Sequence, residues 1–373
     1  MTDCSHSETL QALQPIYFPG FVFSWMSLIS HRLFLPQMLI TPNGEGWPAF
    51  HRLLLALLNF AAPFFKASTM PKAARGLQQG VLRILLLLLH DFPEFLSAYY
   101  FSICEAIPTS CVQIRNVVLS AFPGTILLPD PHPSTLNEMF QDASVTPVIN
   151  SEYRALLQSA DLQALDQQLL GRGNEGIMSV IADRLVHDSN EAGERYNMPV
   201  LNALILYTGT STAAQVAARN DTAPFSPNDP GVALIQYLAS TFDFEGKWNC
   251  LLWYIQYSHP SLCSGRHHLV SAIALNLRYP SQHTFWFSAM LIHLFTEIKD
   301  DSFKEVTIKV LLERVLSHRP HPWGIIMTII ELLRDPRCDL MYSKFMTNFP
   351  EISAILRKVN SHVNGSTSRS SIH

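Results

Sequence analysis

The sequence predicts an all-α protein, and three observations favour that class. Leucine is the most frequent residue and glycine is sparse, with 16 in 373 residues. Few stretches alternate apolar and polar residues with the period of two that strands require, whereas many windows place apolar residues at helical spacing. Charged residues make up only 15% and apolar residues 48% of the chain, against about 25% charged residues in typical soluble domains. Either much of each helix should be buried, or a partner should cover exposed apolar surface.

The first third of the chain should contain five helices. Their predicted ranges are 21–40, 47–60, 76–90, 91–104 and 111–121. Pro36 is expected to kink or end the first of them, because proline removes a backbone donor. The helix 76–90 is apolar all round and is therefore expected to be central. Asp91 is the N-cap candidate of the next helix, with Pro93 and Glu94 in its first turn.

The clearest internal boundary is the segment 123–133, PGTILLPDPHP, whose four prolines force an extended path. It interrupts a single predicted solenoid domain, residues 10–360. Beyond it, helices are predicted at 151–160, 161–170, 177–187, 197–219, from Pro230 onward, and at 283–298, 302–315, 322–333 and 351–359. Residues 361–373 are polar and are predicted to form a disordered tail.

The last third has the most regular pattern. Ser302 and Glu305 predict a capping box at the start of one helix. The apolar face of that helix should consist of Ile308, Leu311, Leu312 and Val315. Lys304, Lys309, Glu313 and Arg314 fall off this face. Antiparallel helices with short joints and no strict repeat fit a HEAT-like helical-repeat solenoid.

Charge and cysteine content exclude several function classes. The net charge is −4, with 26 basic and 30 acidic residues, whereas nucleic acid as the main ligand usually leaves a basic excess. The six cysteines show no CxxC spacing and are predicted to be free thiols in a reducing compartment. No signal peptide is predicted, because the first 14 residues are polar. The longest apolar run, near 84–89, is far shorter than the ~20 residues of a membrane span.

No group of residues predicts a reaction. His318 and His321 flank a proline bend without a cysteine or acid in ligand spacing, whereas zinc needs three or four converging ligands. A rigid turn with Trp323 packed at the joint is the preferred interpretation. His90-Asp91 resembles part of a triad, yet no serine or cysteine lies on a nucleophile elbow. We therefore expect no catalytic residue, no metal and no cofactor.

Two segments near the C-terminus are candidates for protein binding. Each ends a predicted helix, and together they could lie on one edge of the solenoid. The candidate residues are Arg278, Tyr279, Arg319, His321 and Trp323. Arginine and aromatic residues are enriched at binding hot spots. The alternative is that Tyr279 and Trp323 only pack the joints between helices.

One stretch of about forty-five residues carries a family resemblance. It begins at Leu86 and reads LLLLHDFPEFLSAYYFSICEAIPTSCVQIRNVVLSAFPGTILLPDP. It resembles the C-terminal homology domain of the Not scaffold, the largest subunit of the eukaryotic CCR–NOT messenger-RNA deadenylase complex. Further blocks resemble the same domain in the same order, at 15–34, 46–64, 195–210, 275–295 and 311–336.

The resemblance implies a scaffold domain without catalytic activity. Such a domain docks the Not-box subunits as a heterodimer and contacts deadenylases and RNA-binding adaptors only indirectly. Tethering raises the effective concentration of the nucleases, which supports messenger-RNA deadenylation, decay and translational repression. The implied location is the cytoplasm, including mRNA-processing foci, and the nucleus. Family members are far longer, so this chain would be the last part of one, as a fragment or a truncated gene product.

Two other functions remain open from the sequence. One is a different HEAT-type adaptor, for example a transport or translation platform, which would hold other partners. The other is a helical hydrolase, which would need a pocket with a converging nucleophile and base.

One segment departs from the family pattern. That pattern runs from Asp243-Phe244-Glu245-Gly246 directly to Arg266, whereas residues 247–265 intervene here. Gly246-Lys247 can be encoded GGT-AAG, which contains a splice donor, and Ser264-Gly265 can be encoded TCA-GGN, which contains an acceptor in the same phase. The hypothesis is a retained intron, and the segment is expected to be a poorly packed loop or stray helix.

Overall fold

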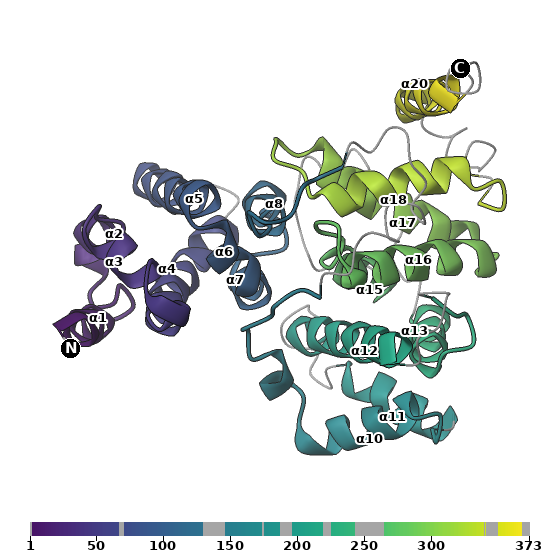
Figure 1. Cartoon of the computed structure of the whole chain (residues 1–373), viewed down its shortest axis with the longest axis horizontal. Coiled ribbons are helices and arrows are strands. Elements are labelled where there is room, and N and C mark those ends of the chain that lie inside the picture. Colours follow the sequence, from purple (N-terminus) through teal and green to yellow (C-terminus); the bar gives the residue numbers. More distant parts are fainter. Residues whose placement is uncertain are drawn as a thin grey trace. The chain divides into compact units, whose positions relative to one another are not determined.

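The computed structural model describes residues 2–66, 71–129, 146–173, 175–186, 196–218, 225–242, 265–338, 340 and 350–367 (Figure 1). Within these ranges the regular structure is helical, with seventeen α-helices and three short 3₁₀ helices. The β-type pairing found there is an isolated bridge between Val186 and Tyr196. The predicted all-α class is confirmed.

The helices group into two compact units. The first contains residues Met1–Thr125 and Val148–Glu152, and the second contains the described residues within Ile126–Pro147, Tyr153–Asn249 and His259–His373. The boundary at Thr125 lies inside the break predicted at 123–133. The extent of a single domain, 10–360, stays a prediction.

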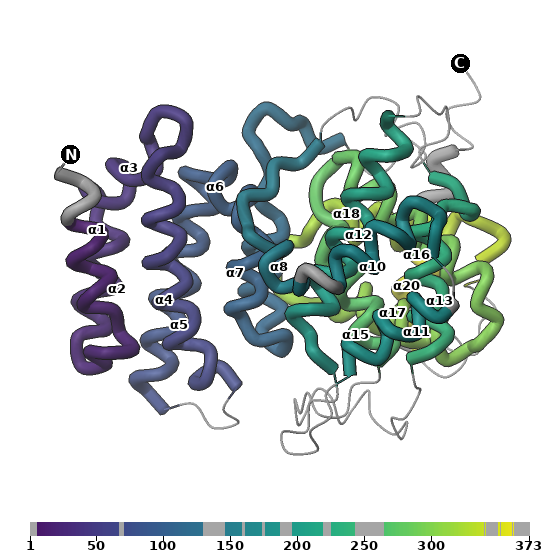
Figure 2. Tube along the Cα trace, turned by 90° about the horizontal axis from the view of Figure 1, so that it is seen from below, coloured from purple at the N-terminus to yellow at the C-terminus, as the bar shows by residue number. Residues whose placement is uncertain are grey.

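Unit 1 is built around the long helix α4. Its elements are α1 (Thr2–Ala12), η1 (Pro19–Phe21), α2 (Val22–Ile29), α3 (Phe34–Leu39), η2 (Pro42–Gly44), α4 (Trp47–Lys66), α5 (Lys72–Asp91), α6 (Pro93–Ala98), α7 (Tyr100–Ala106) and α8 (Val112–Leu119). Helix α4 packs against α1, α3, α5 and α7 (Figure 2). Its apolar side chains Phe50, Leu53, Leu54 and Leu57 are fully buried, so α4 provides much of the core of the unit.

Helix α4 is long and apolar enough to cross a membrane by length and composition. Its packing against four other helices accounts for the same composition, because its buried apolar face fills the core of the unit while Arg52, Asn59 and Lys66 remain exposed. We therefore treat α4 as the core helix of unit 1.

Three predictions for unit 1 were wrong in detail. The range 21–40 is divided at Ser30, and Pro36 lies in the first turn of α3, where its missing donor costs little. Helix α5 is not central, since Leu86 is 43% exposed. Asp91 is the last residue of α5 and not an N-cap, and α6 begins at Pro93 without a side-chain cap.

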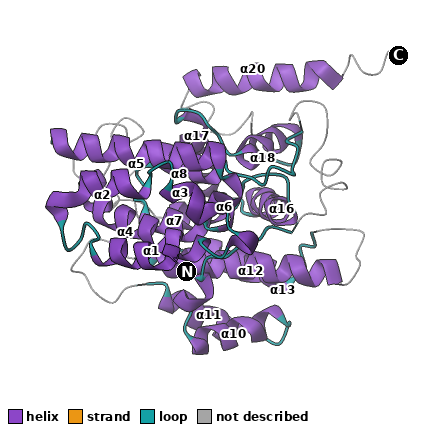
Figure 3. Ribbon diagram, turned by 60° about the vertical axis from the view of Figure 1, so that its left-hand side comes forward, coloured by secondary structure: helices purple, strands orange, loops and turns teal. Residues whose placement is uncertain are grey.

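Unit 2 stacks its helices in successive layers (Figure 1). Its elements are η3 (Tyr153–Leu156), α10 (Ser159–Leu169), α11 (Glu175–Arg184), α12 (Met198–Ala218), α13 (Pro230–Thr241), α15 (Gly265–Ala274), α16 (Gln282–Glu297), α17 (Asp301–Leu316), α18 (Trp323–Arg334) and α20 (Pro350–Thr367). Helix α12 packs on α15 and α16, and α15 packs on α17 (Figure 1). Helix α16 packs on α18, and α18 packs on α20 (Figure 3). Neighbour-to-neighbour packing of this kind is typical of helical repeats.

Several details of unit 2 differ from the prediction. Helix α17 is capped by Asp300, whose carboxylate accepts a hydrogen bond from Ser302 N, so the predicted capping box of Ser302 and Glu305 was wrong. Arg314 is buried, because α17 is covered on more than one face. Helix α20 extends to Thr367, seven residues into the predicted tail, and residues 368–373 lie outside the described residues.

Most of the segment 247–265 lies outside the described residues, and α15 begins at its last residue, Gly265. The described chain on either side of this gap comes together. A Cβ atom placed on Gly265 would lie 3.0 Å from Cβ of Phe242. The last described residue before the gap and the first one after it are therefore close neighbours.

Candidate protein-binding site

The candidate binding residues lie at a joint between two helix pairs in unit 2. The joint consists of the α15–α16 turn, residues 275–281, and the α17–α18 turn with the start of α18. Gly324 N donates a 2.5 Å hydrogen bond to the carbonyl oxygen of Arg278, and the hydroxyls of Ser288 on α16 and Thr328 on α18 lie 2.9 Å apart. The structure thus brings together two segments that are about forty-five residues apart in the sequence.

The α15–α16 turn is held by its own hydrogen bonds. Ser281 is the N-cap of α16 and accepts from Thr284 N. Thr284 Oγ1 accepts from Arg278 N at 3.2 Å. Arg278 and Tyr279 are only 4% and 3% exposed, and the guanidinium lies over the ring, 5.1 Å from its centroid. These two side chains therefore pack the joint.

Trp323 also faces inward. It is 7% exposed and belongs to an apolar cluster with Phe285, Met327 and Ile330. Its indole Nε1 donates a 3.1 Å hydrogen bond to the carbonyl oxygen of Pro129. This bond anchors the extended proline-rich segment of unit 2 at the first turn of α18.

Arg319 and His321 are the accessible members of the set. Arg319 is exposed, precedes a cis proline and lies in the α17–α18 turn. His321 is partly buried, and its pKa is lowered by burial and by the charge of Arg319. Of the five predicted binding residues, Arg319 is therefore the most accessible to a partner.

The histidine motifs do not form a reactive centre in the described part of the chain. No group of three His, Cys, Asp or Glu side chains there could hold a metal ion. His90 Nδ1 lies 2.6 Å from Asp91 Oδ1, but the His90 side chain is 87% exposed at the end of α5. This pair is a solvated helix terminus.

Sequence reasoning missed one serine–histidine contact in unit 1. His51 Nε2 lies 2.7 Å from Ser102 Oγ, which is also 3.0 Å from Ser151 Oγ. The pKa of His51 is lowered to about 4 by burial and by nearby Arg52, so the imidazole is a weak base at neutral pH. Asn150 N donates to Ala98 O, and these contacts thus hold residues 148–152 against the helices of unit 1.

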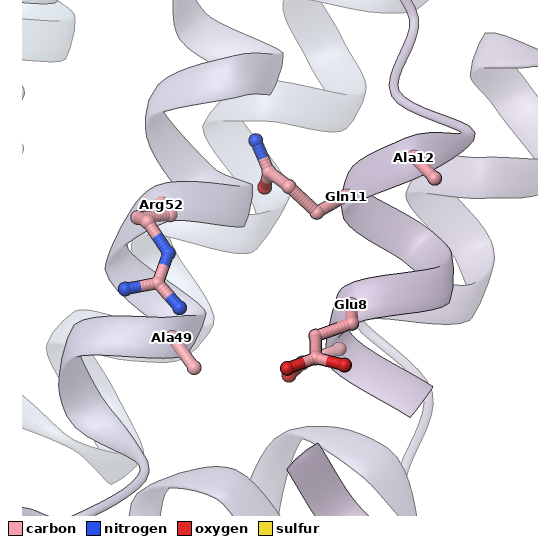
Figure 4. Close-up of a pocket in the computed structure, with 6 residues that line it drawn as sticks. Glu8, Gln11, Ala12, Ala49 and Arg52 are labelled. Atoms are coloured by element: carbon pink, nitrogen blue, oxygen red, sulfur yellow. The ribbon is translucent and has the colours of Figure 1, made fainter. Parts of the chain in front are cut away.

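A pocket of about 320 Å³ lies between α1 and α4 (Figure 4). Glu8 and Arg52 point into it from opposite helices, with Gln11 and Ala49 beside them. Both charged side chains are exposed. An accessible acid and a guanidinium do not form a nucleophile–base pair, so the pocket does not indicate catalysis.

The stacked helices of unit 2, each packed on its neighbours, are typical of a helical-repeat domain. The family model "CCR4-Not complex component, Not1" matches residues 4–257 and 255–360. The chain belongs to the Not1 family.

Relatives and solved structures agree with this assignment. The chain is 32% identical to the CCR4-NOT transcription complex subunit let-711 of Caenorhabditis elegans, over 94% of this chain and 13% of that protein. It is 30% identical to the general negative regulator of transcription subunit 1 of Schizosaccharomyces pombe, over 98% and 16%. The chain thus spans less than a fifth of either relative.

Two solved structures share the fold. The NOT1 superfamily homology domain from Chaetomium thermophilum superposes with a TM-score of 0.81 and 26% identity, over 96% of this chain and 68% of that one. A Not1 C-terminal domain in complex with Not4 superposes with a TM-score of 0.77 and 25% identity, over 94% and 67%.

Proposed function

We propose that this chain is a non-catalytic scaffold domain that docks the Not-box subunits of the CCR–NOT complex. The observation that carries the proposal is the likeness, over 94% of this chain, to a Not1 C-terminal domain that was solved with Not4 bound. A docking domain acts by holding partners close to their substrate, so it needs rigid surfaces and no reactive group. The packed joint in unit 2 supplies a rigid base, on which Arg319 is exposed.

The wider role follows from the same family. We propose that the domain supports deadenylation, decay and translational repression of messenger RNA through partners that it tethers. Its proposed location is the cytoplasm, including mRNA-processing foci, and the nucleus. A tagged chain that stays outside both compartments would contradict this location.

Arg319 is the residue of the joint that we propose to contact the partner. Replacing it with glutamate should weaken binding of the purified Not-box heterodimer by about tenfold, because an attractive charge at the rim becomes repulsive. Isothermal titration calorimetry would measure the change. The control is Arg357→Glu on α20, an exposed arginine with the same charge change.

Two results would contradict this proposal in different ways. If the unmodified chain does not bind the heterodimer or Not4, the docking function is wrong. If it binds but Arg319→Glu and Arg357→Glu bind equally well, only the assignment to Arg319 is wrong. The role of the other predicted residues would then be to stabilise the joint; these are Arg278, Tyr279, His321 and Trp323.

We also propose that residues 247–265 are encoded by a retained intron. The closeness of Phe242 and Gly265 supports this, because residues 243–246 suffice to connect Phe242 to Arg266 without the insert. The family match also falls into two parts that meet at 255–257. Deleting residues 247–265 should leave the melting temperature equal or higher, since a shorter loop costs less closure entropy.

Transcript sequencing and the deletion variant test this proposal separately. Spliced messages that lack the segment should predominate, and the shortened protein should retain the helical circular dichroism of the full chain. A single mature message that always contains the segment would reject the intron. A shortened protein that fails to fold would show that the segment is a structural part of the domain.

A further inference from the structure

One stretch of unit 1 is rich in positive charge, although the unit as a whole carries as many acidic as basic side chains. Residues 9–90 contain six Lys or Arg side chains and one acidic side chain, Glu45, a net charge of +5 in a chain whose total is −4. The basic residues are Arg32, Arg52, Lys66, Lys72, Arg75 and Arg83. The exposed ones on α5 lie on a single helical face.

That face of α5 runs from Lys72 through Arg75 to Arg83, three residues that are all exposed. Their spacing of three and eight residues keeps them on one side of the helix, over about 16 Å. No described acidic side chain forms an ion pair with any of the three within the residues that the structure covers. Their charges are therefore available to a partner.

Apolar side chains lie beside these cations. Helix α2 lies beside α5 (Figure 3). The ring of Phe23 lies next to Gly76, where an added Cβ atom would be 3.6 Å from Cε1 of Phe23, and Met26 lies next to Gly80. Phe23 is nevertheless 46% exposed, as is Leu28, and Leu86 continues the α5 face at 43%. This surface thus combines basic side chains with exposed apolar ones.

We propose that this α2–α5 face, defined by Phe23, Lys72, Arg75, Arg83 and Leu86, binds an acidic amphipathic segment of a partner protein. The occupant follows from charge complementarity, and the exposed apolar side chains require a partner with apolar residues of its own. Nucleic acid fits less well, because three cations are few for a phosphate backbone and Leu86 offers it nothing. The proposal rests on the docking function, since it assigns this face to a Not-box partner.

The test uses the full chain and the purified Not-box heterodimer. The variant Lys72→Glu/Arg75→Glu/Arg83→Glu should bind the heterodimer at least tenfold more weakly than the unmodified chain, and the salt dependence of Kd should decrease. The control is Arg172→Glu/Arg357→Glu/Lys358→Glu, which changes the net charge equally at exposed positions of unit 2. It should bind as the unmodified chain does. Circular dichroism checks that both variants are folded.

Other outcomes overturn the proposal. Equal binding by the α5 variant, or equal losses in both variants, would show that this face has no specific role. Binding of poly(A) RNA by the unmodified chain that is lost only in the α5 variant would identify a nucleic-acid site instead. A heterodimer that ignores the unmodified chain would reject the docking function itself, and this proposal with it.

Discussion

Replacing Gly324 with alanine should lower the free energy of unfolding by about 3 kcal/mol, because the added methyl group overpacks the joint of unit 2. Its Cβ atom would lie 2.7 Å from the carbonyl carbon of Leu277 and 2.9 Å from Arg278 N. Both are backbone atoms, so no flexible side chain can move aside. The hydrogen bond from Gly324 N to Arg278 O would have to lengthen as well. Urea denaturation would measure the loss.

Gly20 provides a matched control for this substitution. A Cβ atom on Gly20 would meet nothing within 4 Å, so Gly20→Ala should change the stability by less than about 1 kcal/mol. Equal stability of the two variants would mean that the turns can separate at no cost. The joint would then not be the rigid element that the docking proposal needs.

Acidification should destabilise unit 2 between about pH 6.5 and pH 4, because two of its histidines are partly buried in surroundings that favour the neutral form. The pKa of His268 is lowered to about 4, mainly by burial and then by His267. The pKa of His283 is lowered to about 4 by burial and then by Arg278. Unfolding restores the ordinary value of 6.5, so the unfolded chain binds more protons in this range. The stability that the two neutral histidines contribute is therefore fully present above pH 6.5 and is lost as the pH falls toward 4.

By pH 4, each histidine should lower the free energy of unfolding by an amount on the order of 3 kcal/mol. This follows from the difference between its ordinary and folded pKa values, since one pKa unit corresponds to about 1.4 kcal/mol. The double variant His268→Gln/His283→Gln should show a flatter dependence of the melting temperature on pH. The control His318→Gln changes an exposed side chain and should behave like the unmodified chain. Parallel curves for the unmodified chain and the double variant would contradict the assignment.

The sequence predicted helix boundaries well where a proline restricts the backbone conformation. The prolines of 123–133 marked the boundary between the units, and Asp229-Pro230 marked the start of α13. Caps were harder, because Asp300 and Ser302 both have the chemistry to cap α17 and only the local backbone decides between them.

Burial could not be predicted from apolar runs alone. Leu86 belongs to an unbroken apolar run yet is exposed, whereas Arg314 is charged yet buried. The reason is that the tertiary fold determines how many other helices cover each face of a helix. The structure brings Arg278, Tyr279 and Trp323 to one joint with their side chains inward, and the sequence pattern did not decide between this packing and an exposed binding edge. The excess of basic residues in 9–90 was visible to a simple count over a window, and the chain-wide charge concealed it.

The meeting of Phe242 and Gly265 has a practical consequence for engineering. A polypeptide whose two attachment points nearly touch can be exchanged for a compact protein with adjacent termini, since nothing needs to be bridged. A fluorescent protein inserted at this position would label the domain internally and leave both ends of the chain unaltered. Genome editing at this position could then follow the scaffold in living cells.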